Sequence, residues 1–561
     1  MTYQKKYSEW LEKADSDTVK ELEALKGNEK EIEDRFYKTL DFGTAGLRGV
    51  MGAGTNRMNK YVIGQATQAL AQYVVEHGME KRGAVIAYDC RIKSDEYAKQ
   101  CASVLAANGI KVYLYESLRP TPQLSYSIRK LNAATGINVT ASHNPKQYNG
   151  YKVYWAEGSQ ILDDIADSIA VNISRINPFS DVKTTDFNDA LKSGQITMLG
   201  KEMDDMFIKE ILSLTLNDDI DKDINIVYTP LYGTGLVPVT RILKERGFHN
   251  IVIVEEQKNP DGTFPTTPYP NPENVKVFEI PKKYGKETNA DMIIATDPDC
   301  DRIAMMIKDD KEDYVFCTGN QTGSLLAEYM LSQRLKKGLY SEKDAVIQSI
   351  VSGSVVPKIA KHYGTHFFET LTGFKYICGL ANEFDMTGEY RYVFGYEESI
   401  GYCIETFTRD KDGVSAAMMM CEMAGYYKKQ GISLYQALNN IYEKYGYMSE
   451  NQISIEYPGI KGEKTKKTVM SRWRKKPLVQ IDNIKCSVCK DYINGYDGLP
   501  AQDALKYEFE DGSWYALRPS GTEPKLKVYI NAMGHSKKEA DDLMKAFTED
   551  IKGYLAKCEN K

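Results

Sequence analysis

Three aspartates alternate directly after an apolar segment. Residues 292–296, Met-Ile-Ile-Ala-Thr, are followed by Asp297, Asp299 and Asp301. In extended chain this spacing places all three carboxylates on one side of the turn. Two unit charges about 4 Å apart repel by roughly 4 kcal/mol at an effective dielectric near 20, so such a trio requires a cation. Oxygen ligands favour Mg²⁺, with Mn²⁺ as a substitute. The alternative, a solvated acidic turn, is disfavoured by the apolar strand before it.

A serine follows a second apolar segment. Residues 136–141, Gly-Ile-Asn-Val-Thr-Ala, lead to Ser142, and an Asn-Gly pair follows at 149–150. This pattern predicts a buried strand that ends in a tight turn and presents the Ser142 hydroxyl. Loops at such strand ends carry chemistry in open α/β sheets. For an isolated serine, the usual alternative is a side chain that only satisfies a turn.

Three further segments offer groups that bind anions or hydroxyls. Residues 518–525, Arg-Pro-Ser-Gly-Thr-Glu-Pro-Lys, can form a nest of backbone N–H groups beside a guanidinium that matches phosphate. Residues 397–399, Glu-Glu-Ser, supply acceptors for sugar hydroxyls. Residues 43–49 surround Arg48 with glycines, so the backbone can approach a ligand closely. Structural turns are the alternative for the first two segments.

Composition and charge exclude several classes of protein. Lysine and arginine number 72 against 78 aspartates and glutamates, with a formal net charge of -6 and no long run of one sign. This balance disfavours general nucleic-acid binding, which needs a basic footprint. The chain has no G-x-x-x-x-G-K-[ST] motif and no kinase signature set. No apolar segment reaches 18 residues, and the N-terminus lacks an apolar core, so we expect neither a membrane span nor a signal peptide.

The ten cysteines are scattered along the chain and do not form a disulfide framework. Together with the missing signal peptide, they favour a reducing cytoplasm. Cys486 and Cys489 alone form a C-x-x-C pair. A structural zinc site requires two further ligands nearby, so we interpret this pair as two ordinary thiols.

The elements that position these loops form repeated α/β units. Strands predicted at 84–88 and 111–115, with a helix over 94–108, imply βαβ units. After residue 451, strand-like segments and a helix over 536–557 predict a smaller α+β domain. We therefore expect three similar α/β domains with mixed sheets and a C-terminal α+β domain. The expected boundaries are 1–205 with a helical lead-in over 1–40, 206–318, 319–450 and 451–561.

These loops, in this order, resemble those of the α-D-phosphohexomutase family, most of all its phosphoglucomutase and phosphopentomutase branch. The matching segments are the active-serine loop at 140–145, the metal loop at 297–302, the sugar loop at 395–401, the phosphate loop at 518–525 and the opening glycine-arginine motif at 43–49. The match spans about residues 40 to 530. It implies a heart-shaped molecule whose four domains each contribute one loop to a central cleft that binds a small sugar phosphate.

The resemblance also implies roles for single residues. Ser142 would carry the phosphoryl group and bind one Mg²⁺ per chain, together with Asp297, Asp299 and Asp301. Lys152, with Arg48, would act as general base. The charge of a phosphoserine beside three aspartates also requires cations nearby, and His143 is one of those at hand. The implied substrate contacts are Arg302, Lys375, Glu397, Ser399, Arg518, Ser520, Gly521, Thr522 and Lys525.

These features together predict an intramolecular phosphotransferase. We expect it to interconvert glucose 1-phosphate and glucose 6-phosphate through a phosphoserine, with glucose 1,6-bisphosphate as intermediate and activator. The insertion of Tyr396 before Glu397 is similar to the sugar loop of the branch that includes pentose-phosphate enzymes. A phosphopentomutase or another hexose-phosphate mutase is therefore the alternative on the same fold. A metal-dependent phosphatase and a non-catalytic sugar-phosphate sensor are alternatives of other classes. We expect no nucleic-acid or membrane partner, and the sequence favours neither a monomer nor a homodimer.

Overall fold

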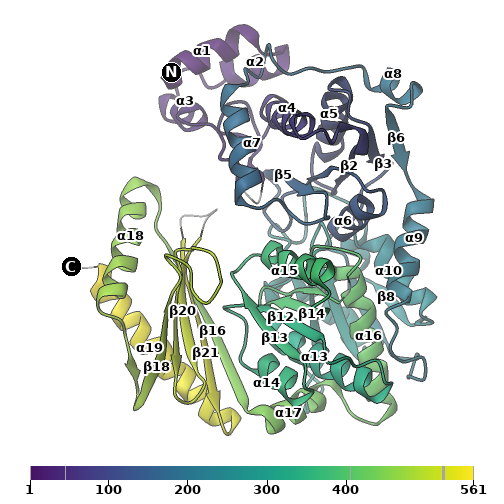
Figure 1. The fold of residues 1–561 in the computed structure, drawn as a ribbon, viewed down its shortest axis with the longest axis vertical. Coiled ribbons are helices and arrows are strands. Elements are labelled where there is room, and N and C mark those ends of the chain that lie inside the picture. Colours follow the sequence, from purple (N-terminus) through teal and green to yellow (C-terminus); the bar gives the residue numbers. More distant parts are fainter. Residues whose placement is uncertain (1, 44–45, 405, 521–524, 560–561) are drawn as a thin grey trace. The chain divides into compact units, whose positions relative to one another are not determined.

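The computed structural model describes residues 2–43, 46–404, 406–520 and 525–559, which form four β-sheets and the helices that cover them (Figure 1). Contacts within the chain divide it into two compact units. The first unit comprises the chain up to Cys317 together with Cys378–Met386 and Ser399–Lys429. The second comprises Thr318–Ile377, Thr387–Glu398 and the chain from Gln430 onward.

Three short helices lead into the first unit. They are α1 (Tyr3–Lys13), α2 (Ser16–Glu23) and α3 (Glu29–Phe36). Each begins after a residue whose side chain accepts a hydrogen bond from the first turn: Thr2, Asp15 and Asn28. Such caps contribute about 1 kcal/mol each. Apolar side chains of the three helices, Trp10, Leu22, Ile32 and Phe36, form a small core together with Ala53, which follows β1.

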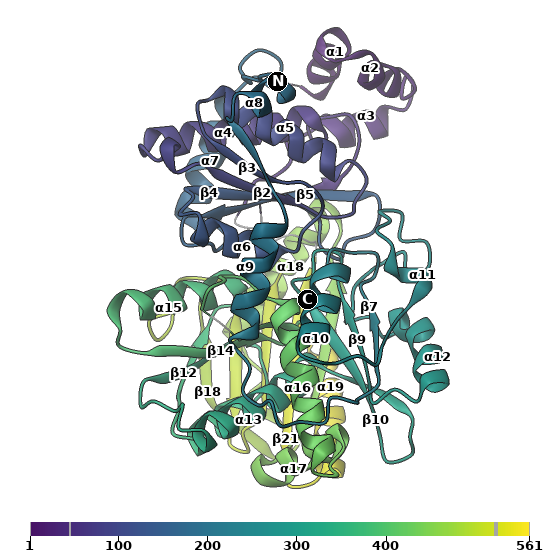
Figure 2. The same ribbon diagram turned by 90° about the vertical axis from the view of Figure 1, so that its right-hand side faces the viewer.

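The first sheet of this unit is mixed and has the strand order β1-β5-β4-β2-β3-β6. Its strands are β1 (Leu47–Val50), β2 (Ala84–Tyr88), β3 (Val112–Tyr115), β4 (Thr135–Val139), β5 (Tyr148–Trp155) and β6 (Ile196–Leu199). β5 is antiparallel to β1 and β4, whereas β4, β2, β3 and β6 are mutually parallel. The helices are α4 (Lys60–Glu76), η1 (Glu80–Arg82), α5 (Ser94–Ala107), α6 (Thr121–Lys130), α7 (Asp163–Arg175) and α8 (Phe187–Lys192). α4 and α5 lie on one side of the sheet and α6 on the other (Figure 2).

The second sheet, also in the first unit, has the order β11-β10-β9-β7-β8. Its strands are β7 (Ile226–Thr229), β8 (Ile251–Ile253), β9 (Met292–Thr296), β10 (Ile303–Lys308) and β11 (Tyr314–Cys317). β7 is parallel to β8 and β9, and β10 is antiparallel to β9 and β11. The accompanying helices are α9 (Lys201–Leu212), α10 (Leu236–Glu245), α11 (Glu255–Lys258), η2 (Val275–Phe278) and α12 (Glu279–Thr288), with α16 (Gly413–Lys429) packed on α10. Residue 205, the first expected boundary, therefore lies inside α9.

The third sheet lies in the second unit, where β12 (Asp344–Ser349) pairs in parallel with both β13 (His366–Thr370) and β14 (Arg391–Glu397). The helices of this segment are α13 (Gly319–Lys336), α14 (Val355–His362), α15 (Phe374–Thr387) and α17 (Leu434–Tyr445). α13 begins with a capping box between Thr318 and Gln321. The short strand β15 (Gly401–Cys403) follows β14 in the chain and belongs to the first unit.

The fourth sheet, in the second unit, is antiparallel throughout and has the order β16-β21-β20-β19-β18-β17. Its strands are β16 (Tyr447–Glu456), β17 (Gln480–Ile481), β18 (Ile484–Asp491), β19 (Leu505–Phe509), β20 (Trp514–Pro519) and β21 (Lys525–Gly534). Helices α18 (Gly459–Lys475) and α19 (Lys537–Glu559) share one apolar core with the sheet, which includes Trp473, Tyr515 and Phe547. Residue 450, the last expected boundary, lies inside β16.

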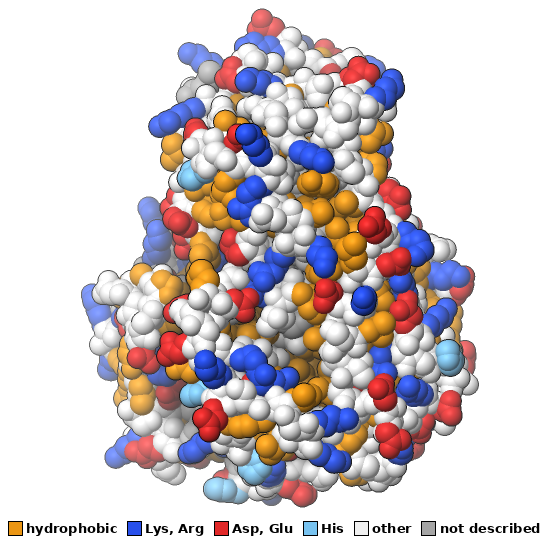
Figure 3. Space-filling model, turned by 45° about the vertical axis from the view of Figure 1, so that its right-hand side comes forward, with side chains coloured by type: hydrophobic (Ala, Val, Ile, Leu, Met, Phe, Trp, Pro, Cys, Tyr) orange, Lys and Arg blue, Asp and Glu red, His pale blue; other side chains and the backbone are white. Residues whose placement is uncertain are grey.

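The surface carries charges of both signs. On the face shown in Figure 3, lysines and arginines are interspersed with aspartates and glutamates. Among the described residues, no helix is both long and apolar enough to cross a bilayer.

Candidate active site

The turn that presents Ser142 is held from beneath by a chain of hydrogen bonds. β4 is buried over its whole length and ends at Val139. Ser142 has a φ of 50°, in the left-handed region that costs a non-glycine residue about 1 to 3 kcal/mol. Its N–H donates to Thr140 Oγ1 (2.8 Å), and the Thr140 hydroxyl donates to the buried Asp89 (2.6 Å). These contacts stabilise the strained conformation, in which the buried serine hydroxyl donates to Asp297.

Arg91 fastens both ends of the same turn. Its Nη1 donates to the carbonyls of Pro145 and Tyr148, each at 3.0 Å. Its Nη2 donates to the carbonyls of Asn144 and Ser142, the latter at 2.6 Å. Buried Asp89 lies 3.3 Å from Arg91 Nε and balances its charge. Nothing in the sequence Asp89-Cys90-Arg91 indicates which carbonyls this arginine binds, so its role is not predictable from the sequence.

β5 passes close to the serine turn and carries Lys152. A Cβ added to Gly150 would lie 2.4 Å from the Thr140 carbonyl oxygen, so only glycine allows β5 to pass this close. Lys152 is buried and donates from Nζ to Asp299 Oδ2 (2.8 Å) and Asp301 Oδ2 (3.3 Å). The neighbouring strand β1 places Arg48 opposite Gly150, where Arg48 Nη1 donates to Asn144 Oδ1 (3.0 Å).

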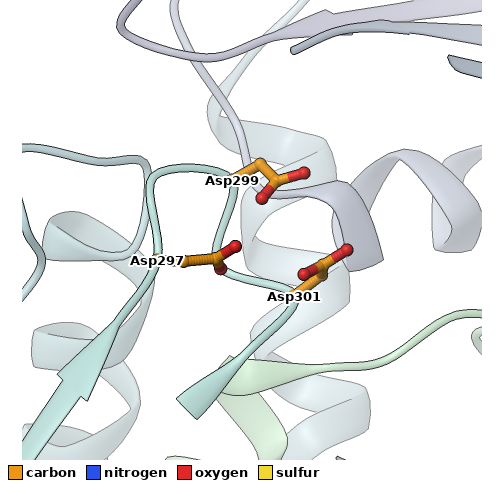
Figure 4. A group of neighbouring side chains, drawn as sticks. All are labelled: Asp297, Asp299 and Asp301. Carbon is orange, nitrogen blue, oxygen red and sulfur yellow. The ribbon is translucent and has the colours of Figure 1, made fainter. Parts of the chain in front are cut away.

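The three aspartates lie on the loop between β9 and β10, and their carboxylates point toward a common space (Figure 4). One oxygen from each lies within 4.8 Å of the others. The loop is closed by the N–H of Cys300, which donates to the Asp297 carbonyl (2.9 Å), and by the N–H of Arg302, which donates to Asp297 Oδ1 (3.1 Å). All three side chains are buried.

The unpaired carboxylate oxygens of this cluster fit a divalent cation. In the part of the chain that the structure describes, Asp299 Oδ1 and Asp301 Oδ1 are buried and have no hydrogen-bond partner. Leaving a buried polar atom unpaired costs about 1 to 3 kcal/mol, and more for a charged one. Asp297 Oδ2 accepts a hydrogen bond from the Ser142 hydroxyl at 2.7 Å, so the serine oxygen stands at the edge of the same cluster. An all-oxygen set of this kind suits Mg²⁺.

The pKa values of the three aspartates shift in different directions. Burial, then the charges of Asp299 and Asp301, raise the pKa of Asp297 well above its usual value. Burial opposes ionisation of Asp299 and Asp301 too, but Lys152 lowers the pKa of both, and Lys411 assists at Asp301. In return, these two carboxylates outweigh burial and raise the pKa of Lys152. The cluster therefore opposes ionisation of Asp297 most strongly, and a bound cation would relieve this opposition.

Lys411 is a second cation that the sequence analysis missed. It lies between β15 and α16, with Nζ 3.3 Å from Asp301 Oδ2 and 3.0 Å from Asp410 Oδ1. A Cβ on Gly401 would meet the Lys411 side chain at 2.1 Å, so this glycine makes room for it. The run Arg409-Asp410-Lys411-Asp412 looks like a solvated loop in sequence, yet all four residues are buried. The available signal was the apolar helix that starts directly after it.

His143 and Arg302 complete the group in the first unit. His143 Nδ1 lies 3.1 Å from Ser142 Oγ. Burial, with the charges of Arg302 and Arg48, lowers the pKa of His143 well below its usual value, which disfavours the cationic ring expected beside the serine. Arg302 Nη1 donates to Glu273 Oε2 (3.2 Å). The first unit thus gathers Arg48, Ser142, His143, Lys152, the three aspartates and Arg302, and it also contains Ser399.

The second unit contains the other candidate substrate-binding residues. Glu397 Oε1 accepts a hydrogen bond from the N–H of Gly373 (2.7 Å), two residues before Lys375. Ser520 N donates to the Lys525 carbonyl (2.8 Å) and closes the base of the predicted phosphate loop. Among the described residues, Arg518 Nη1 is buried without a hydrogen-bond partner, as expected of a guanidinium that receives an anion. Gly521 and Thr522 lie outside the described residues.

Tyr396, the inserted residue of the predicted sugar loop, is a core residue. Its side chain is fully buried, stacks near Phe394 and lies 3.3 Å from Asn320 Oδ1. A Cβ on Gly323 of α13 would meet the ring at 2.7 Å. The insertion therefore fills the interface between β14 and α13.

Glu398 should make stability depend on pH near neutrality. Its carboxylate accepts a hydrogen bond from Ser349 Oγ (3.0 Å), while burial and the charge of Glu397 raise its pKa to about 7 from 4.5. Between these values the folded protein retains a proton that the unfolded chain has released, so stability falls as the pH rises from 4.5 to 7.

We expect Glu398→Gln to remove this loss of stability, so that the variant has a higher Tm than the wild type at pH 8 but not at pH 5. Thermal unfolding at both pH values measures it, with exposed Glu510→Gln as control. A Tm difference that is the same at both pH values would contradict the assignment.

Comparison with known proteins identifies the family. Four models of the phosphoglucomutase/phosphomannomutase family match this chain in order: alpha/beta/alpha domain I at residues 39–178, domain II at 205–311, domain III at 318–445 and the C-terminal domain at 472–550. A phosphoglucomutase of Staphylococcus saprophyticus is 32% identical over 533 residues, which cover 93% of this chain and 95% of the relative. The chain belongs to the phosphoglucomutase/phosphomannomutase family.

Solved structures of similar proteins agree with this family fold. The open form of parafusin, a phosphoglucomutase from Paramecium, has a TM-score of 0.70 at 18% identity, covering 93% of this chain and 96% of that one. An N-acetylphosphoglucosamine mutase from Aspergillus fumigatus, in complex with GlcNAc-6P and magnesium, has a TM-score of 0.52 at 13% identity, covering 92% and 96%. The family fold thus comprises three α/β domains with mixed sheets and a C-terminal domain with an antiparallel sheet, as the sequence predicts.

Proposed function

We propose that this protein is a phosphoglucomutase that interconverts glucose 1-phosphate and glucose 6-phosphate through a phosphoserine at Ser142. The observation that carries the proposal is the 2.7 Å contact between Ser142 Oγ and Asp297 Oδ2, at the edge of a buried carboxylate cluster. The name of the Staphylococcus relative, phosphoglucomutase, supports glucose as the sugar. We also propose the four-domain division at residues 205, 318 and 450, in which each domain contributes one loop.

The proposed reaction begins with phosphate on Ser142 and a sugar monophosphate in the site. The free sugar hydroxyl attacks phosphorus, a new P–O bond forms to the sugar, and the bond to Ser142 Oγ breaks. Glucose 1,6-bisphosphate results and reorients in the site. Ser142 Oγ then attacks its other phosphoryl group, and the isomeric glucose monophosphate leaves. One Mg²⁺ bound by Asp297, Asp299 and Asp301 would stabilise charge on the transferring group. Added glucose 1,6-bisphosphate would act as activator by phosphorylating Ser142.

Lys152 is the proposed general base, and Arg48 and His143 assist beside the serine. A base must release its proton near neutral pH, yet Asp299 and Asp301 hold Lys152 protonated. If bound Mg²⁺ neutralised these carboxylates, burial would become the main influence on the pKa of Lys152, and burial lowers the pKa of a lysine.

The proposed substrate contacts divide between recognition of hydroxyls and of phosphate. Glu397 and Ser399 would accept hydrogen bonds from sugar hydroxyls, and Arg302 and Lys375 would be further substrate contacts. The proposed phosphate contacts are Arg518, Ser520, Gly521, Thr522 and Lys525. The buried, unpaired Nη1 of Arg518 in the described chain supports this assignment.

A direct assay separates this function from its alternatives. With glucose 1-phosphate, Mg²⁺ and trace glucose 1,6-bisphosphate, we expect glucose 6-phosphate to form at a rate that falls when the activator is omitted. Steady release of inorganic phosphate would indicate a phosphatase instead. A kcat/KM larger for ribose 1-phosphate than for glucose 1-phosphate would indicate a phosphopentomutase.

Arg518→Ala should weaken substrate binding. Loss of charged hydrogen bonds to phosphate costs roughly 1.5 to 3 kcal/mol, which corresponds to an increase in KM of about 10- to 150-fold. Steady-state kinetics with glucose 1-phosphate measures this increase. Lys485→Ala, at an exposed lysine of the same sheet, is the matched control and should leave KM unchanged. An unaltered KM in Arg518→Ala would show that another group binds the phosphate.

A further inference from the structure

Cys486 and Cys489 lie on β18, where a regular strand would keep them apart. Side chains three positions apart in a strand point to opposite faces, because successive residues alternate. The structure instead places the two Sγ atoms 3.6 Å from each other. Some feature of β18 must therefore change the alternation between these residues.

A β-bulge makes this change. Along the pairing with β19, Cys486 lies opposite Phe509, Val488 opposite Glu508 and Cys489 opposite Tyr507, so Ser487 is an extra residue. The partners of the two cysteines are two positions apart and share one face of the sheet. Because a bulge inserts one residue without a partner, it brings both thiols to that same face.

The pair is accessible at the edge of the sheet. β17 pairs with Ile484 and Lys485 of β18, and the N–H of Cys486 donates to the Val479 carbonyl (2.8 Å), so no described strand pairs with this side of β18 from Ser487 onward. Cys489 is exposed, while Cys486 is half-buried and donates from Sγ to the Val488 carbonyl (3.2 Å). Burial, and then the hydrogen bond with Cys489, raise the pKa of Cys486 to about 12. Cys489 is therefore the thiol that meets a reagent first.

The surroundings argue against a metal site at this pair. Among the described residues, the one cluster of three or more potential metal ligands is formed by Asp297, Asp299 and Asp301. A structural zinc site takes four ligands, so the two thiols are two ligands short. A disulfide needs only the two sulfurs, and their approach from 3.6 Å to about 2.05 Å is within reach of a side-chain rotation at the exposed Cys489.

We propose that Cys486 and Cys489 form a reversible disulfide by exchange with a small-molecule disulfide. The Cys489 thiolate, having lost its proton to solvent, attacks one sulfur of the small disulfide; a mixed disulfide forms and one small thiolate leaves. Cys486 loses its proton and attacks Cys489 Sγ, which expels the second small thiolate. The two cysteines lose two electrons in total, and the small disulfide gains them and becomes two thiols.

Thiol trapping with oxidised glutathione tests this site. The reduced protein is incubated with oxidised glutathione and about 0.1 mM glutathione, then alkylated and digested with trypsin, which releases Cys486 to Lys490 as one peptide. We expect the wild-type peptide to lose two hydrogens, to resist alkylation and to be restored by dithiothreitol. In Cys486→Ser, the resolving thiol is missing, so Cys489 should keep its glutathione. An effective thiol concentration of about 1 mM or more predicts at least about tenfold less adduct in the wild type than in this variant.

Two results would overturn the proposal. One is a wild-type peptide that carries as much glutathione on Cys489 as the Cys486→Ser variant. The other is a wild-type peptide with both thiols alkylated under conditions that modify the variant. Cys489→Ser is the matched control: half-buried Cys486 should then react little. The readout is a mass, so it is independent of the proposed mutase activity.

Discussion

Ser142→Ala should lower kcat by on the order of 10⁴-fold or more, because the change removes the oxygen that we propose accepts and returns the phosphoryl group. The turn itself should persist, since Thr140, Asp89 and Arg91 hold its backbone independently of the Ser142 hydroxyl. The measurement is glucose 6-phosphate formation in a coupled assay. Intact mass after incubation with glucose 1,6-bisphosphate should show an added phosphoryl group in the wild type and none in the variant.

An exposed serine of the same domain provides the control for this variant. Ser168→Ala on α7 should retain full activity and the same phosphorylated mass as the wild type. Appreciable turnover in Ser142→Ala, or a phosphoryl group still present on it, would mean that another side chain is the nucleophile.

Removal of divalent metal should abolish activity and lower thermal stability together. Mg²⁺ would relieve the repulsion among three buried carboxylates and occupy the unpaired oxygens of Asp299 and Asp301. A ligand at 100 times its Kd stabilises the folded state by about 2.7 kcal/mol. We therefore expect Mg²⁺ to raise the Tm of the chelator-treated protein by several degrees while it restores turnover. Differential scanning calorimetry and the coupled assay measure the two effects.

Asp299→Asn locates this effect at the cluster. The variant should lose most of the Tm increase caused by Mg²⁺ as well as its activity, whereas exposed Asp310→Asn should keep both. If Asp299→Asn responds to Mg²⁺ as the wild type does, then the ion that stabilises the protein binds elsewhere.

Local patterns in the sequence predict the strands and their polar ends well. The apolar run at 292–296 coincides with β9, the run at 84–88 coincides with β2, and the helix predicted at 94–108 differs from α5 by one residue. Such segments are predictable because burial on both faces demands continuous apolar residues. The Asp297 loop follows from the same argument, since the polar residues begin where the strand ends.

Contacts between distant segments escape the same reasoning. Lys411 follows Asp301 by more than one hundred positions, and only the packing of α16 near β9 and β10 brings it to the carboxylates. Arg91 finds its four carbonyl partners through the turn geometry at Ser142, which residue types do not specify. Likewise, the C-x-x-C spacing alone indicates opposite faces, and the bulge at Ser487 reverses that outcome.

Arg91 binds carbonyl groups on both sides of the serine while its own charge is balanced by Asp89. If Ser142 carries the phosphoryl group as proposed, its side chain would gain and lose about two negative charges in every cycle, and Arg91 would keep the backbone around it in place. Arg91 would thus influence the reaction through the backbone of the turn, which its four hydrogen bonds hold. We expect substitutions of Arg91 to lower the rate of the enzyme without changing which sugar it prefers.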